Sequence, residues 1–429
     1  MNDEVTIVGR SGFLTGERVI SARLGEHIRA NPEPIAQHSL TALASISEDV
    51  AVVAETVALA DRILTRRRSE CWMRHLHLTI PVWEVAAFTS AATASLEDTL
   101  AFLTGDNWTF EFSQRGSRPM RQDYLPLTDT KPRYIVPYSG GLDSFAQARL
   151  LEGIHGFDSL LRVNAGTLQS GVAGAPLLSI PRRFHAGHPR ELTYRTRPFV
   201  YFSIAAIAAA TLEVEAIVVG ENGQGALGPS FARFGNEWPF RSTHPGFIHR
   251  LQGFLTQLFQ KNVRFDQPQL WRTKGEVLGE LKDRNLLDGW EGTTSCSARP
   301  LQRHGNHGCG ICGGCILRQT AVHAAGLVPA NRTSFNLSSE SLTLRSSTGH
   351  ETSMTANERD IISHSCLSMD RFATLPLRCS VLAREVTDLP VAGAAGLVSR
   401  LSGKHSQEWN SMIASLPRDA WISRQFLSE

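Results

Sequence analysis

The sequence lacks a long apolar run. Its most apolar stretch, Phe199 to Leu212, is short and continues into Glu213 and Glu215. A helix that spans a bilayer needs about 20 apolar residues, so we expect this stretch to form a buried helix instead. The segment Met1 to Arg10 also lacks the apolar core of a targeting signal. Both absences predict a cytoplasmic protein without a membrane partner.

The sequence also lacks an excess of charge of either sign. Its 429 residues carry a formal net charge of +2, which gives no reason to expect direct nucleic-acid binding. The content of 42% apolar and 20% charged residues is ordinary for a globular protein, and the length allows two or three domains. Three consecutive arginines, Arg66 to Arg68, follow a helical pattern. We expect them to form a solvated face or to cap the helix C-terminus.

Cysteine is scarce, and its number is odd. Seven cysteines without a secretion signal argue against a disulfide framework. Three of them are most simply packing residues, namely Cys71, Cys366 and Cys379.

The other four cysteines follow the spacing C-x12-C-x2-C-x2-C, with glycines that allow a tight loop. Four thiolates suit tetrahedral Zn²⁺, and because they complete its coordination shell we expect a structural zinc. An iron–sulfur cluster is the alternative, and a redox pair is less favoured. His304 and His307 lie between these cysteines and are expected to be loop residues. The predicted ligands are Cys296, Cys309, Cys312 and Cys315.

Apolar spacing divides the chain into three segments. In residues 1–131 this spacing predicts an α+β unit, with a helix over 43–66 and strands over 75–83 and 108–115. Residues 336–429 predict a polar stretch with short strands, followed by helices. The middle segment, 132–335, alternates strands and helices, which predicts an α/β fold whose parallel sheet carries helices on both faces. Its expected strands are 134–139, 159–164 and 215–222, and its expected helices are 142–154, 197–213, 247–259 and 273–287.

A glycine turn joins the first strand of that sheet to the first helix. Backbone N–H groups converge at such a junction, and the helix start adds partial positive charge, so the turn predicts an anion site. Asp143 would hold Mg²⁺ or cap the helix. The alternative is a plain turn with a helix cap. The residues expected to bind the anion are Ser139, Gly140, Gly141, Leu142, Asp143 and Ser144.

The run Ser-Gly-Gly-Leu-Asp-Ser after an apolar strand resembles the PP-loop of the ATP pyrophosphatases. That resemblance implies an adenine-nucleotide α-hydrolase-like (HUP) fold and a loop that binds the β- and γ-phosphates of ATP. It also implies cleavage between the α- and β-phosphates, which leaves AMP on the substrate. The expected reaction is therefore adenylation.

Together with the cysteine pattern, the loop resembles the QueC-type 7-cyano-7-deazaguanine synthases of queuosine-precursor biosynthesis. The segments "RTRPFVYFSIA", "RTKGEVL", "TTSC" and "CGICGGCILR" are similar to motifs of that family, and they include Arg197, Ser203, Lys274 and Arg318. The segment "AAGLVPANRTSF" resembles its closing motif, with Phe335 where a tyrosine is usual. The resemblance covers about 200 residues, 133–335.

The resemblance implies an AMP- and pyrophosphate-forming C–N ligase that uses ATP, Mg²⁺ and structural Zn²⁺. A 7-deazaguanine acid, such as 7-carboxy-7-deazaguanine, would be adenylated and then attacked by an amine. Lys274 is the candidate cation for the phosphates. Arg197 would serve in the same way or hold the substrate, and Asp143 completes the expected catalytic set. The alternative for both cations is an ordinary surface residue at a helix start.

Two stretches depart from the synthase pattern, one after the first crossover and one after "VVGEN". With these departures and the added residues at both ends, the chain resembles the longer QueC-like proteins of anti-phage defence operons, such as the Qat systems (QatC). For those, the expected acceptor is an amine of a partner protein from the same operon. The alternatives are a housekeeping synthase that uses ammonia and a retired nucleotide-binding module. Another PP-loop chemistry, such as tRNA thiolation, is disfavoured.

Overall fold

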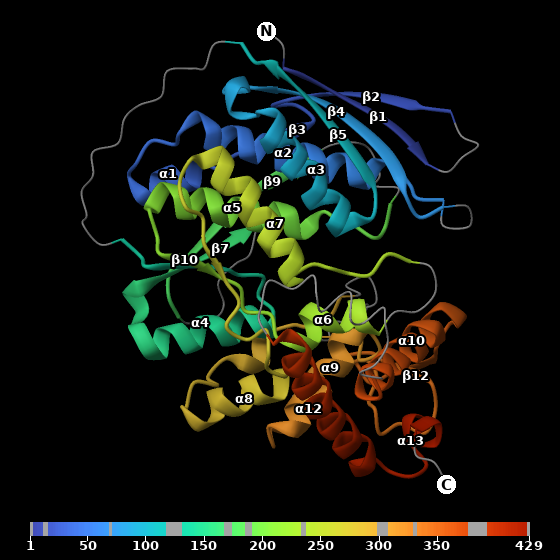
Figure 1. Cartoon of the computed structure of the whole chain (residues 1–429). Helices are drawn as coiled ribbons and strands as arrows, with labels where there is room; N and C mark the ends of the chain where they lie inside the picture. Colours follow the sequence, from blue (N-terminus) through green and yellow to red (C-terminus); the bar gives the residue numbers. More distant parts are fainter. Residues whose placement is uncertain are drawn as a thin grey trace. The chain divides into compact units, whose positions relative to one another are not determined.

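The computed structural model describes residues 3–11, 16–67, 71–116, 131–166, 174–184, 191–232, 237–297, 308–328, 333–375 and 393–426 (Figure 1). The chain divides into two compact units, each assembled from separate pieces of sequence. The first comprises Met1–Ser139, Ile154–Val219 and Asn236–Gln267. The second comprises Gly140–Gly153, Gly220–Gly235 and Pro268–Glu429.

The first unit contains a four-stranded sheet formed by β1 (Glu4–Ser11), β2 (Arg18–Arg23), β4 (Arg74–Val82) and β5 (Asn107–Gln114). Their order is β2-β1-β4-β5, and only β4 and β5 pair in parallel. Helices α2 (Ser45–Ile63) and α3 (Ser90–Thr104) pack against this sheet, and α1 (Glu33–Ser39) precedes them. The predicted helix over 43–66 and the two predicted strands are confirmed, whereas β1 and β2 were not predicted.

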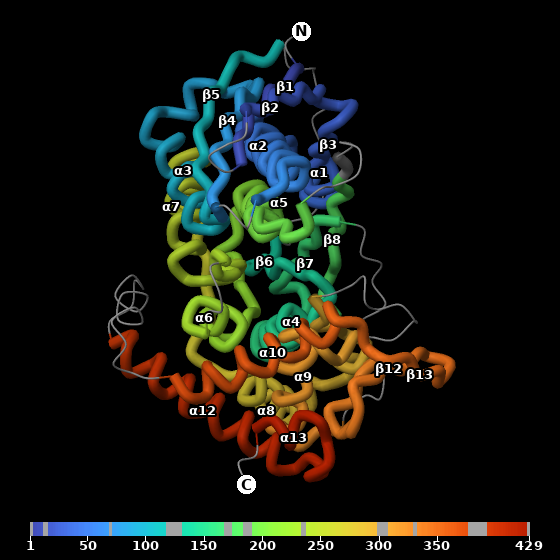
Figure 2. The backbone as a smooth tube through the Cα atoms, turned by 90° about the vertical axis from the view of Figure 1, so that its right-hand side faces the viewer, coloured from blue at the N-terminus to red at the C-terminus, as the bar shows by residue number. Residues whose placement is uncertain are grey.

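A second sheet of the same unit is entirely parallel. Its order is β11-β10-β6-β7-β8. Helix α5 (Arg197–Leu212) packs against β6, β7 and β10, and it lies between them and α2 (Figure 2). This confirms the buried helix predicted for the most apolar stretch. The strands are β6 (Tyr134–Pro137), β7 (Leu160–Ala165), β8 (Leu177–Ile180), β10 (Ala216–Val218) and β11 (Phe265–Asp266).

Helix α7 (Pro245–Phe259) packs on α3, and β3 (Ile28–Ala30) pairs with β9 (Arg182–Phe184). One hydrophobic core therefore includes residues before and after position 131, such as Val57 of α2 and Ile207 of α5. The division into 1–131, 132–335 and 336–429 stays a prediction from the sequence. The two compact units have other boundaries, and each combines separate pieces of the chain.

Arg66 corrects one expectation. It is buried, and its guanidinium lies 2.5 Å from Asp106 and 3.2 Å from Asp61. The same two carboxylates pair with the buried Arg74. Burial disfavours the charge of Asp61, but the two guanidinium groups outweigh it and lower its pKa to about 2. Arg66 is therefore part of an internal ion network and not of a solvated face, because Asp61, five residues before it, and Asp106, 40 residues after it, neutralise its charge.

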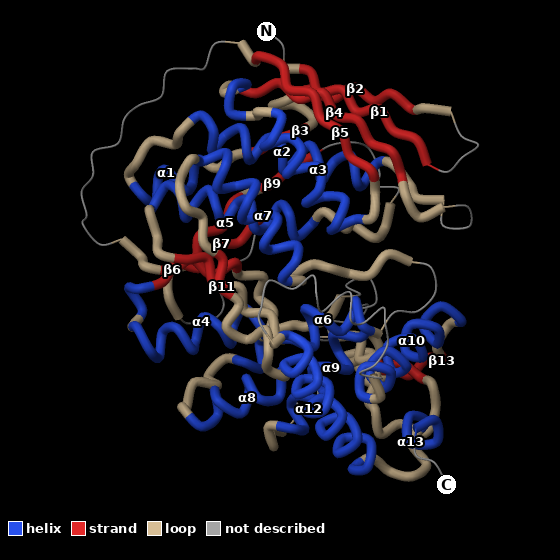
Figure 3. Tube along the Cα trace, in the orientation of Figure 1, coloured by secondary structure: helices blue, strands red, loops and turns tan. Residues whose placement is uncertain are grey.

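The second unit is mostly helical (Figure 3). Helix α9 packs against α8, α10 and α12, and a two-stranded hairpin follows the cysteine-rich loop. The predicted short strands and helices after 335 are confirmed. No described helix in either unit is both long and apolar enough to cross a membrane. The elements are α4 (Leu142–His155) up to Gly153, α6 (Gly223–Phe231), α8 (Lys274–Asp283), α9 (Gly313–Ala324), β12 (Thr343–Arg345), β13 (Glu351–Ser353), α10 (Ala356–Ala373), α12 (Ala394–Ser415) and α13 (Trp421–Phe426).

Candidate functional site

The predicted phosphate loop forms the turn between β6 and α4. Gly140 has φ of +72°, a left-handed conformation that glycine adopts without strain. The hydroxyl of Ser144 donates to the carbonyl of Gly141 at 3.0 Å. The Gly140 carbonyl accepts from the backbone N–H of Thr294 at 3.2 Å, which ties the loop to the segment before Cys296. Leu142 is buried and begins the helix.

The side chain of Lys274 contacts Asp143, the second residue of α4. Its Nζ lies 2.8 Å from Oδ2 of Asp143, and its side chain is only 5% exposed. Thr273 and Glu276 form a capping box that fixes the start of α8, where Lys274 is the first helical residue. The alternative that Lys274 is an ordinary surface lysine is therefore wrong.

Two neighbouring residues that the sequence interpretation did not single out complete this cluster. Asn222 caps α6 through Gly225, and its amide donates to Asp143 Oδ1 at 2.8 Å and to Glu221 Oε1 at 3.1 Å. Burial and the negative charge of Asp143 raise the pKa of Glu221 to about 8, although Lys274 opposes them. We call Asp143, Glu221, Asn222 and Lys274 the loop cluster.

Glu221 and Asn222 occupy positions in the fold that favour ligand binding. They follow β10, and the glycine turn follows β6, which is the parallel neighbour of β10. Ligands gather beyond the carboxyl ends of adjacent parallel strands, so residues in both positions are candidates for one site. The sequence did not reveal that these two strands are neighbours.

Arg197 is not brought to the loop cluster by any described contact. It begins α5 in the first unit, is exposed, and places its guanidinium 5.2 Å from the ring centre of Tyr201. Its catalytic role stays a prediction. Ser139 also belongs to the first unit and directly precedes the glycine turn.

The four predicted cysteine ligands lie together in the second unit. Their sulfur atoms all lie within 4.8 Å of one another, and all four residues are buried. The Sγ atoms of Cys309 and Cys315 are 4.0 Å apart, and those of Cys296 and Cys312 are 3.9 Å apart. Zn–S bonds of about 2.3 Å in a tetrahedron require S···S separations of about 3.8 Å.

The sulfur positions therefore fit a zinc ion. The backbone N–H of Cys312 points at Cys309 Sγ at 3.4 Å, a contact that stabilises a thiolate. Cys71 and Cys366 lie outside the cluster, as expected. Predictions for His304, His307 and Cys379 fall outside the described residues.

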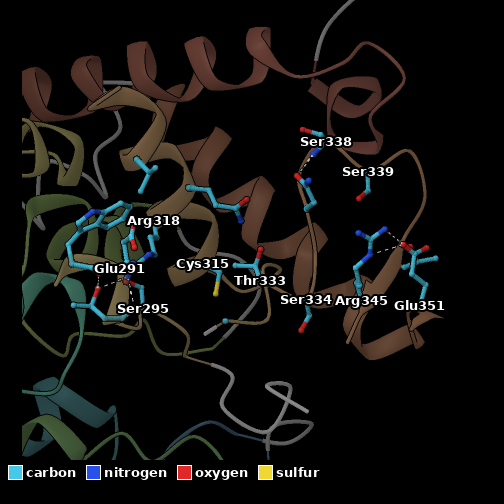
Figure 4. A pocket seen from close by; sticks show the side chains of 17 residues that line it. Glu291, Ser295, Cys315, Arg318, Thr333, Ser334, Ser338, Ser339, Arg345 and Glu351 are labelled. Atoms are coloured by element: carbon cyan, nitrogen blue, oxygen red, sulfur yellow. Dashed lines mark hydrogen bonds and ion pairs between the residues drawn. The ribbon is translucent and has the colours of Figure 1, made fainter. Parts of the chain in front are cut away.

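A polar cavity of about 510 Å³ lies beside the cysteine cluster (Figure 4). Arg318 lies on one side of it, where Nη1 donates to Thr293 Oγ1 at 2.7 Å and Nη2 donates to the Trp290 carbonyl at 3.2 Å. Burial lowers the pKa of Arg318. The opposite side carries residues after Phe335: Asn336, Ser338, Ser339, Thr343, Arg345 and Glu351.

Comparison with known proteins supports the family resemblance. The chain is similar to a curated 7-cyano-7-deazaguanine synthase of Brucella anthropi, with 24% identity over 227 residues. The match covers 45% of this chain and 90% of that synthase. No protein-family model matches the chain. The narrower likeness to proteins of defence operons, the PP-loop fold and the roles of the site residues stay predictions.

Proposed function

We propose that this chain is an ATP-dependent ligase that adenylates the carboxylate of a 7-deazaguanine and transfers the acyl group to an amine. The observation that carries the proposal is the contact between Asp143 and Lys274. It joins the glycine loop to a cation that the family resemblance had selected independently. The distant likeness to a 7-cyano-7-deazaguanine synthase supports the choice of substrate.

In the first step, a carboxylate oxygen of the deazaguanine acid attacks the α-phosphorus of ATP. The bond from that phosphorus to the bridging oxygen breaks, and pyrophosphate leaves. Negative charge grows on the phosphates, where loop N–H groups and the Lys274 ammonium stabilise it. This step needs no covalent enzyme nucleophile.

Asp143 and Glu221 are the residues that would hold Mg²⁺ at this place. Carboxylate oxygens are the ligands that Mg²⁺ prefers, and the two carboxyl groups interact electrostatically. Among the described residues, Asn222 donates to Oδ1 of Asp143 and Lys274 donates to Oδ2, which leaves lone pairs on both oxygens for a cation. A Mg²⁺ ion held by these two residues would supply positive charge to the leaving pyrophosphate.

In the second step, the amine attacks the acyl carbon, the bond to AMP breaks, and the amine nitrogen loses a proton. We propose that the amine belongs to a partner polypeptide. Supporting this, the side of the cavity opposite Arg318 carries residues beyond 335, outside the part that resembles the synthases. Its Arg345–Glu351 ion pair and hydroxyl groups suit a polar peptide segment. A role in anti-phage defence stays a prediction.

The test uses the purified chain with ATP, Mg²⁺ and 7-carboxy-7-deazaguanine. We expect pyrophosphate release that depends on the acid and disappears in Asp143→Ala. Absence of release with the wild-type chain would favour a retired nucleotide-binding module. Intact masses of co-expressed operon proteins then identify the acceptor: an adduct of deazaguanine size supports a polypeptide. Free nitrile formed from ammonia supports the synthase reaction instead.

A further inference from the structure

A chain of hydrogen bonds runs from α12 to the first residue of α8. The backbone N–H of a first helical residue has no partner inside its helix. In Lys274 this N–H donates to Oε1 of Gln224, on α6, at 2.7 Å. Gln224 and Lys274 are both buried, so water does not compete for the hydrogen bond between them.

His405 of α12 determines which way the Gln224 amide points. The Nε2 atom of His405 lies 2.9 Å from the Met369 carbonyl, which only accepts, so Nε2 carries the ring hydrogen. Burial lowers the pKa of His405 to about 4, and the ring is neutral at pH 7. Its Nδ1 therefore accepts from Gln224 Nε2 at 2.8 Å, and Gln224 presents its oxygen to Lys274.

Glu408, three residues further along α12, holds the cap of α8. Its Oε1 accepts from the Thr273 hydroxyl at 2.5 Å, and its Oε2 lies 3.4 Å from Gln224 Nε2. A Cβ atom on Gly275 would lie 2.6 Å from Glu408 Oε1, so this approach needs the glycine. The capping box already provides hydrogen-bond acceptors for the backbone N–H groups of Thr273 and Glu276. The added contacts fix where the start of α8 lies.

We propose that Gln224, His405 and Glu408 are positioning residues that aim Lys274 at the loop cluster, which makes α12 part of the adenylation machinery. The inference rests on the proposed function, in which Lys274 acts on ATP. His405 and Glu408 lie beyond 335, outside the part of the chain that resembles the synthases. The reason for an effect on rate is geometric, because a displacement of about 1 Å at a reacting centre costs about 100-fold.

The first test is Gln224→Met, which keeps the side-chain length and removes both hydrogen-bonding groups. With ATP and 7-carboxy-7-deazaguanine, we expect kcat for pyrophosphate release to fall about 10- to 100-fold. The Kd for ATP should change less than about threefold. If Gln224 acts through Lys274, its effect should largely vanish in the Lys274→Met background, because residues of one network are non-additive.

The second test compares His405→Asn with His405→Phe. Asparagine can still accept from Gln224, so it should retain far more of the wild-type kcat than phenylalanine does. Met412→Ala, a buried change on the same helix, is the control for destabilisation. It should lower the Tm and leave kcat near the wild-type value.

Three results would overturn the inference: wild-type kcat in Gln224→Met, additive effects with Lys274→Met, or equal kcat in the two His405 variants. Failure of the wild-type chain to release pyrophosphate is a different result. It counts against the proposed function itself.

Discussion

Lys274 and Asp143 form an ion pair between the starts of two helices, with 2.8 Å between Nζ and Oδ2 across 131 residues of sequence. The side chains are 5% and 22% exposed, so water screens the pair only in part. The negative charge of Asp143 also disfavours ionisation of Glu221. Lys274 therefore supplies the positive charge where two carboxyl groups and, in our proposal, the phosphates of ATP meet.

Lys274→Met tests that role. We expect pyrophosphate release to fall by about 10²- to 10³-fold, the usual cost of removing one group that stabilises transition-state charge. Lys282→Met is the matched control, because Lys282 is an exposed lysine of the same helix that donates to the carbonyls of Ala325 and Gly326. Activity within about threefold of wild type in Lys274→Met would show that this cation does not act on ATP.

The local parts of the site could be predicted from the sequence. The strand, glycine turn and helix around Asp143 carry their signal within a few residues, as does the cysteine spacing. The third strand was predicted over 215–222 but ends at Val218. Val219 to Asn222 instead lead into the cap of α6, so the prediction extended the strand into the polar residues of that turn.

The parts that depend on three-dimensional neighbours could not be predicted. Sequence order does not reveal that β6 lies beside β10, and this hid Glu221 and Asn222. His405 and Glu408 are spaced as residues on one face of an ordinary amphipathic helix. Arg66 looked exposed because its partner Asp106 lies 40 residues away.

The cysteine cluster predicts one bound zinc per chain. Cys312→Ser should lose zinc, as measured by elemental analysis, and lower the Tm, because structural zinc contributes directly to folding free energy. Cys71→Ser, which lies outside the cluster, should keep the metal. Bound iron and visible absorption in the wild-type chain would instead indicate an iron–sulfur cluster.

Gly220 lies so close to α4 that a larger residue at this position is predicted to clash with that helix. A Cβ atom there would lie 2.6 Å from the Asp143 carbonyl oxygen and 2.7 Å from Gln147 Cβ. Gly220→Ala should therefore shift the start of α4, weaken ATP binding, and cost about 1–3 kcal/mol of stability. Gly228→Ala is the matched control, because nothing lies within 4 Å of its added Cβ. Calorimetric ATP titration and urea unfolding measure both effects, and equal results for the two variants would contradict the prediction.

Glu408 predicts a pH dependence of stability. Burial raises its pKa from 4.5 to about 7, although the hydrogen bond from Thr273 opposes the shift. Between those two values, Glu408 is ionised in the unfolded chain and protonated in the folded chain. The unfolded state therefore binds fewer protons, and the free energy of unfolding contributed by this group falls as pH rises through this window. Above about pH 7 both states are ionised, and the contribution is constant.

Glu408→Gln removes this titration and keeps an acceptor for Thr273. The wild-type chain should lose stability relative to the variant between pH 4.5 and 7, by no more than about 3 kcal/mol. Urea unfolding of both proteins at several pH values measures the difference, in which groups common to both chains cancel. Parallel stability curves across this window would show that Glu408 titrates normally in the folded protein. In that case Thr273 and Gln224 face a permanent carboxylate, and the hydrogen bonds that hold the start of α8 are charge-assisted throughout the neutral range.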